Sequence, residues 1–276
     1  MSFYSNHKEE FVKSSTKGLN LHLETNLADF PKANLIMAHG VSESTKIFTP
    51  AASYFNKVGF NVFRYDHRGH GDSDGTRGYI KDYTTLSSDL DKIVEFIKPK
   101  YFQFPTFIFG HSMGGETVLL YGTKYPKKVD GLLATDPVSF YTIPSLGKLP
   151  ISGDPKKYLP FPYNSGLVSD KKTLDKYSAD PANLKNLTIG IMNMMYDGAM
   201  YLRKNISKIS DPFFLMQGND DGYISVLDTI KAFPKIGSQD KELHVYPKLK
   251  HELLNEPTRK WDIYKEISQW INKRIY

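Results

Sequence analysis

The sequence has no cysteine among its 276 residues. That absence excludes a disulfide framework, a zinc site with thiolate ligands and a cysteine nucleophile. Apolar runs as long as the roughly 20 residues of a membrane span are also missing. The N-terminal stretch MSFYSNHKEEFVKSS lacks the apolar segment of a secretory signal. We therefore expect a cytoplasmic protein.

Motifs for cofactors and nucleic acids are missing as well. No phosphate-binding glycine motif and no metal-ligand cluster occurs, so we expect no cofactor and no metal. The net charge is +6, from 36 basic and 30 acidic residues. The basic residues are spread along the chain rather than gathered in one block, which argues against nucleic acid as a partner. We expect a small-molecule partner, with peripheral and transient contact to anionic membrane surfaces as a further prediction.

Short apolar runs alternate with longer helical patterns, which is typical of an α/β protein with a mostly parallel sheet flanked by helices. An antiparallel hairpin over residues 11–16 and 19–24 is predicted to open the chain. Further strands are predicted at 34–39, 61–65, 106–110, 129–135, 213–217 and 243–246. Apolar residues at a period of 3.6 predict helices over 83–97, 113–125 and 261–271.

Residues 137–210 interrupt this alternation. The segment is rich in proline and then gives an apolar, helix-like stretch over 187–202 that holds four of the eight methionines. It is too long for a single strand–helix unit, so we predict a cap inserted into a core of residues 1–136 and 211–276. Methionine suits flexible apolar ligands, and Met192, Met195 and Tyr201 are the predicted substrate-binding residues.

One motif indicates the chemistry. Gly110-His-Ser-Met-Gly114 matches G-x-S-x-G, between a predicted strand and a predicted helix. A serine on such a sharp turn exposes its hydroxyl, and the glycines avoid crowding that a Cβ would cause. The helix N-terminus supplies positive potential for a forming oxyanion. Ser112 is therefore the predicted nucleophile.

A serine nucleophile needs a base and an acid that orients the base, and behind this motif they follow in the order Ser, Asp or Glu, His. Of the eight histidines, His251 lies on a loop just after the last predicted strand. The acid follows the strand at 213–217, where the interval G-x-x-D favours Asp221. Asp220 is the alternative, and Asp136, after the strand at 129–135, is a third candidate.

Acyl transfer also needs two N–H donors for the tetrahedral oxygen. One is expected from Met113, the residue after the nucleophile. The other is expected from Val41, on the loop that follows the strand at 34–39. Gly40 lets the chain turn closely below the site.

These motifs resemble those of the monoacylglycerol lipase and lysophospholipase group of α/β-hydrolases over nearly the whole chain. The similar segments are Gly110–Gly115, Asp66–Ser73, Gly75–Gly78, Ser169–Pro181, Gln217–Asp221 and Tyr246–His251. The resemblance implies an α/β-hydrolase fold with a cap, and Asp221 as the acid. One position departs from the group's His-Gly-x-Gly-Glu pattern, because Ser42 replaces the second glycine.

The predicted function is hydrolysis of carboxylic esters through an acyl-enzyme, with monoacylglycerols or lysophospholipids as substrates. A short-chain carboxylesterase, a thioesterase and a serine aminopeptidase are alternatives on the same scaffold. A binding protein with a vestigial triad is a further alternative, which the intact Ser, Asp and His set argues against. The motifs leave the acyl-chain length, the positional selectivity and the oligomeric state open.

Overall fold

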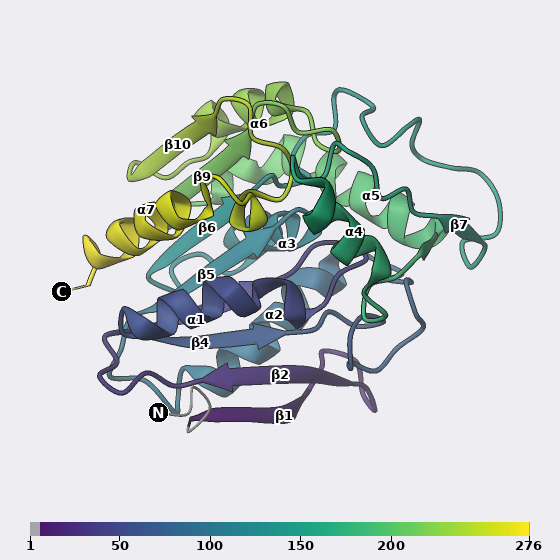
Figure 1. The fold of residues 1–276 in the computed structure, drawn as a ribbon. Coiled ribbons are helices and arrows are strands. Elements are labelled where there is room, and N and C mark those ends of the chain that lie inside the picture. Colours follow the sequence, from purple (N-terminus) through teal and green to yellow (C-terminus); the bar gives the residue numbers. More distant parts are fainter. Residues whose placement is uncertain (1–5, 276) are drawn as a thin grey trace.

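The computed structural model describes residues 6–275, which form one eight-stranded sheet with helices on both faces (Figure 1). The strand order is β1-β2-β4-β3-β5-β6-β9-β10. The strands from β4 to β10 run parallel, and β1 and β2 form the antiparallel edge. Their bounds are β1 His7–Lys13, β2 Asn20–Asn26, β3 Ala33–Ala38, β4 Phe60–Tyr65, β5 Thr106–His111, β6 Gly131–Thr135, β9 Phe213–Gly218 and β10 Lys241–Tyr246.

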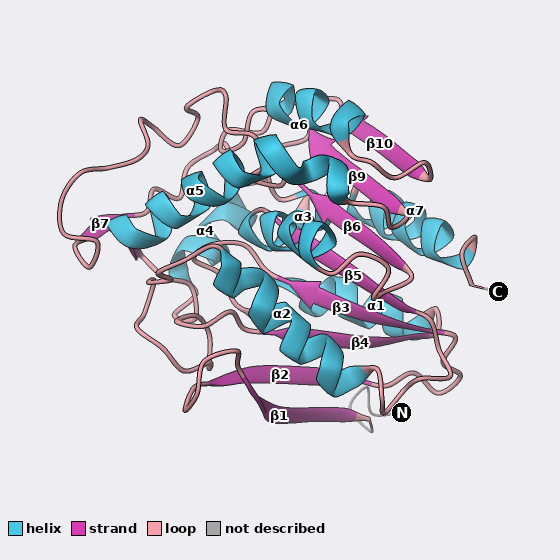
Figure 2. Ribbon diagram, turned by 180° about the vertical axis from the view of Figure 1, so that it is seen from behind, coloured by secondary structure: helices cyan, strands magenta, loops and turns pink. Residues whose placement is uncertain are grey.

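Two helical layers cover the sheet. Helices α1 (Thr49–Lys57) and α7 (Lys260–Asn272) lie on one face, and α2 (Thr84–Ile97), α3 (Met113–Lys124) and α6 (Val226–Ala232) lie on the other (Figure 2). Strand β3 shows how alternate residues of one strand pack against both helical layers. Leu35 packs in the core with α1 and α7, whereas its neighbour Ile36 packs in the core with α2 and α3. Burial on both faces explains why the central strands are continuous apolar runs.

The chain leaves the sheet after β6 and returns at β9. In between it forms β7 (Tyr158–Pro160), α4 (Lys171–Ala179), β8 (Asn186–Thr188) and α5 (Ile189–Asn205). Strands β7 and β8 pair antiparallel as a separate two-stranded sheet. Short 3₁₀ helices lie before α1 at Thr45–Phe48, after α5 at Ile206–Lys208, after α6 at Phe233–Lys235 and before α7 at Leu253–Asn255. We call residues 137–210 the cap segment.

The α/β-hydrolase fold class is confirmed, and each predicted strand overlaps an observed one. The first strand is displaced, because it was predicted at 11–16 and lies at His7–Lys13. The helix predicted over 187–202 is wrong at its start, because Leu187 and Thr188 belong to β8 and the helix begins at Ile189. Helices α1, α4 and α6 were not predicted, since each is shorter than three turns and too short to show a clear 3.6-residue period. No helix within residues 6–275 has both the length and the apolar character needed to cross a membrane.

Candidate active site

Ser112 lies on the sharp turn between β5 and α3. Its backbone has φ +54° and ψ −115°, a conformation that residues other than glycine rarely adopt. The turn presses against strand β3, so that a Cβ at Gly114 would lie only 2.0 Å from the carbonyl oxygen of Ala38. The strain and the two flanking glycines together match the predicted nucleophile turn.

His251 and Asp221, the predicted base and acid, are in direct contact. The Nδ1 atom of His251 lies 2.8 Å from Oδ2 of Asp221, and both side chains are almost fully buried. Burial opposes charging of the imidazole, but the negative charge of Asp221 and its hydrogen bond outweigh this and raise the pKa of His251. Because Nδ1 makes this contact, Nε2 is the ring nitrogen that remains to exchange a proton with another group.

The hydrogen bonds of the loop after β9 distinguish Asp221 from Asp220 as the candidate acid. Asp221 also accepts hydrogen bonds from Gln217 Nε2 at 2.9 Å and from the backbone N–H groups of Tyr223 and Ile224. Asp220 is exposed, and its backbone N–H donates to Leu249.

Asp136 lies beside the acid rather than in its place. It is fully buried after β6 and accepts a hydrogen bond from the Gly218 N–H at 2.8 Å. Burial and the nearby charge of Asp221 raise the pKa of Asp136 well above its usual range. Asp136 is therefore a neighbour of the Asp221–His251 pair, and its own charging is opposed by burial and by Asp221.

The predicted oxyanion loop follows β3. The Gly40 N–H donates to Oε2 of Glu43 at 2.7 Å, so this donor is already used within the loop. Val41 is buried and lines the same cavity as Ser112, and Met113 is the first residue of α3. Ser42 adopts φ +71°, in the left-handed region.

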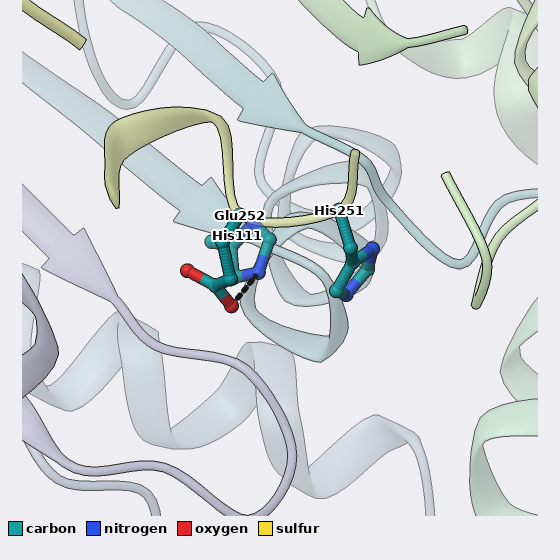
Figure 3. Close-up of side chains that lie close together, drawn as sticks. All are labelled: His111, His251 and Glu252. Carbon is teal, nitrogen blue, oxygen red and sulfur yellow. Dashed lines mark ion pairs between the residues drawn. The ribbon is translucent and has the colours of Figure 1, made fainter. Parts of the chain in front are cut away.

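A second set of buried ionisable groups surrounds the base. His111 Nε2 lies 2.8 Å from Glu252, and the two side chains approach each other directly beside His251 (Figure 3). Tyr177 of α4 donates to Glu252 at 2.7 Å. Burial would raise the pKa of Glu252, but its pairing with His111 holds it well below the usual range. Burial and the charge of Glu252 instead raise the pKa of Glu43.

This set was not predicted, although His111 precedes the nucleophile and Glu252 follows the base directly in sequence. Sequence adjacency to Ser112 and His251 was the available signal. The pairing of His111 with Glu252 joins segments that lie far apart along the chain, so no local sequence pattern predicts it.

A small cavity brings the predicted groups together. Gly40, Val41, Ser112 and His251 line it from the core, and Met195 lines it from α5. A second, larger cavity is lined mostly by residues of the cap segment, among them Met192. The two cavities share a wall made of Leu146, Phe161 and Tyr223.

Tyr201 lies elsewhere. It lines neither of these two cavities, and its ring packs against that of Tyr83 at 5.3 Å between centroids. The expectation that Tyr201 binds substrate therefore finds no support in this arrangement. Tyr83 directly precedes α2, so the ring of Tyr201 lies at the beginning of that helix.

Comparison with known proteins agrees with this geometry. The family model described as "Serine aminopeptidase, S33" matches residues 29–258. The chain belongs to this family. It is a hydrolase of the α/β-hydrolase fold, as the sequence predicted.

Relatives at low sequence identity span most of the chain. A monoacylglycerol lipase of Mycolicibacterium smegmatis is 28% identical over 253 residues, which cover 87% of this chain and 88% of that protein. A monoglyceride lipase of Rattus norvegicus is 27% identical over 257 residues, or 89% of this chain and 84% of that protein. The crystal structure of a thermostable carboxyl esterase from Bacillus coagulans superposes with a TM-score of 0.88 at 19% identity, covering 98% of this chain and 99% of that one.

Proposed function

We propose that Ser112, His251 and Asp221 form a catalytic triad that hydrolyses carboxylic esters of the monoacylglycerol type through an acyl-enzyme. One observation carries this proposal: the strained serine and the base line a single cavity, and the base is held by a buried carboxylate. The relatives named monoacylglycerol and monoglyceride lipase support the substrate class.

Acylation begins when the Ser112 hydroxyl attacks the ester carbonyl carbon and His251 takes its proton at Nε2. Asp221 holds the ring by Nδ1 and stabilises the imidazolium that forms. The tetrahedral oxygen accepts hydrogen bonds from the backbone N–H groups of Val41 and Met113. The alcohol then leaves with the proton of His251, and the acyl group stays on Ser112.

Deacylation repeats these steps with water. His251 takes a proton from water as it attacks the acyl carbonyl, the same two N–H groups hold the oxygen, and the carboxylic acid leaves as Ser112 regains its proton. The neutral form of His251 is required at the start of both halves. Its raised pKa therefore sets the acid limit of activity.

The cap segment supplies the apolar part of the proposed substrate site. Met195 lies in the cavity at Ser112 and Met192 in the adjoining one, and adaptable thioethers suit an acyl chain. An acyl chain bound to Ser112 would cross the wall of Leu146, Phe161 and Tyr223 to reach the second cavity. We propose that residues 137–210 act as a cap over this site. We also propose that the enzyme is cytoplasmic and peripheral, and that its cap makes transient contact with membrane surfaces.

A substrate panel tests the proposal. Monoacylglycerols should give a higher kcat/KM than lysophospholipids, short p-nitrophenyl esters, thioesters and aminoacyl amides. Preference for aminoacyl amides would instead support the aminopeptidase activity in the description of the family. Ser112→Ala should abolish hydrolysis and fluorophosphonate labelling. Ser88→Ala, at a half-buried position of α2 that lines neither cavity, should retain both. Hydrolysis by Ser112→Ala at the wild-type rate would refute the triad.

A further inference from the structure

Ser42 occupies a conformation that its residue type does not favour. It lies in the predicted oxyanion loop directly after Val41, it is 1% exposed, and its φ is +71°. Glycine adopts this region freely, whereas a side chain with a Cβ is strained there. A strained residue persists only where its surroundings hold it in place.

The surroundings that hold Ser42 come from the cap segment. The backbone carbonyl of Ser42 accepts a hydrogen bond from the Leu184 N–H at 2.7 Å. The hydroxyl groups of Ser42 and Tyr163 are hydrogen-bonded at 3.0 Å, and Tyr163 also donates to the Leu184 carbonyl at 2.9 Å. The loop and the cap are therefore joined through both the backbone and the side chain of Ser42.

The same piece of cap reaches the acid and base on its other side. The ring of Tyr163 packs against Phe161 at 5.3 Å, and Phe161 stacks on Tyr223 at 5.8 Å between centroids. Tyr223 donates to the Pro162 carbonyl, and its own N–H donates to Asp221. Residues 161–163 thus span the cavity from the oxyanion loop to the acid loop.

We propose that Ser42 is a positioning residue, which the cap residue Tyr163 fastens so that the Val41 N–H is held toward the reacting carbonyl. The inference rests on the proposed function of the site. In this arrangement the cap completes the oxyanion hole as well as covering the substrate. Neither Ser42 nor Tyr163 transfers a proton, and both act through the backbone of Val41.

Four variants test the contact by steady-state kinetics on a monoacylglycerol and on a short p-nitrophenyl ester. Tyr163→Phe removes only the hydroxyl, Ser42→Ala removes the partner and keeps the strain, and Ser42→Gly removes both. The matched control is Tyr158→Phe, because Tyr158 also joins cap to core, donating to the Arg77 carbonyl at 2.8 Å, but away from the oxyanion loop.

Removing a whole oxyanion donor costs about 10² to 10³ in kcat, so loosening one should lower kcat about tenfold and leave KM within about twofold. We expect this loss for Tyr163→Phe and Ser42→Ala. The loss should be smaller for Ser42→Gly, because glycine keeps φ +71° without the hydroxyl. Adding Tyr163→Phe to either Ser42 variant should cost nothing further, and Tyr158→Phe should match the wild type.

Two results would overturn the inference. One is wild-type kcat in both Tyr163→Phe and Ser42→Ala, with folding checked by thermal unfolding. The other is a loss confined to KM, or losses that add in the double variant, because the contact would then only shape the substrate pocket. A wild-type protein that neither hydrolyses esters nor reacts with a fluorophosphonate would refute the proposed function itself.

Discussion

Replacing Asp221 by asparagine keeps the size of the side chain and removes its charge. In the wild type the carboxylate accepts from His251, from Gln217 and from two backbone N–H groups, so it is fully committed as an acceptor. An amide can offer His251 its NH₂ group, which would stabilise the wrong tautomer of the imidazole. In serine hydrolases with this arrangement the loss is on the order of 10⁴ in kcat, or about 5 kcal/mol of transition-state stabilisation.

Two neighbouring aspartates are the controls. Asp220→Asn changes an exposed side chain, and Asp136→Asn replaces a buried carboxyl, whose pKa is raised by burial and by the charge of Asp221, with an amide of the same size. We expect kcat for both to stay within about tenfold of the wild type, far from the loss expected for Asp221→Asn. The assay is kcat on a p-nitrophenyl ester, with thermal unfolding to check the fold. An Asp136→Asn or Asp220→Asn enzyme as impaired as Asp221→Asn would refute the assignment of the acid.

Three further predictions concern pH, stability and chain length. Because the pKa of His251 is raised, kcat/KM should fall as pH falls through that pKa, which a pH profile of activity would show. Stability should depend on pH in the opposite direction. The stabilisation from the charged His251–Asp221 pair is present below about pH 6.5 and is lost as pH rises through the pKa of His251 in the folded protein. Glu252→Gln should lower the free energy of unfolding by about 3–5 kcal/mol in urea, because it leaves His111 without its buried partner. Glu43→Gln should cost far less, because burial and the charge of Glu252 raise the pKa of Glu43 and so oppose its charging. Leu146→Ala should raise the ratio of kcat/KM for long over short acyl esters by opening the wall between the two cavities, and an unchanged ratio would contradict that route.

Much of the fold is readable from local patterns. Strand β5 and helix α3 flank a motif whose spacing alone demands a sharp turn, and Ser112 is found on it. The interval from Gly218 selects Asp221 over Asp220, and the contact with His251 agrees with that choice. These features depend on a few consecutive residues, which is why the sequence predicts them.

The remaining features depend on how separate loops meet. Ser42 is visible in the sequence as an unusual residue, but its bond to Tyr163 joins positions about 120 residues apart. The pairing of His111 with Glu252 likewise requires the ends of β5 and of the loop after β10 to converge. The contact of Tyr201 with Tyr83 likewise depends on how α5 packs, which the sequence of α5 alone does not determine.

The most direct test of the account is to look for the acyl group itself. The protein would be mixed with a p-nitrophenyl ester, quenched in acid within milliseconds and digested for mass spectrometry. The account predicts an added acyl mass on the peptide that contains Ser112, appearing before steady state and missing from Ser112→Ala. Ester hydrolysis by the wild type with no acylated peptide, or with the acyl group on a different residue, would contradict it.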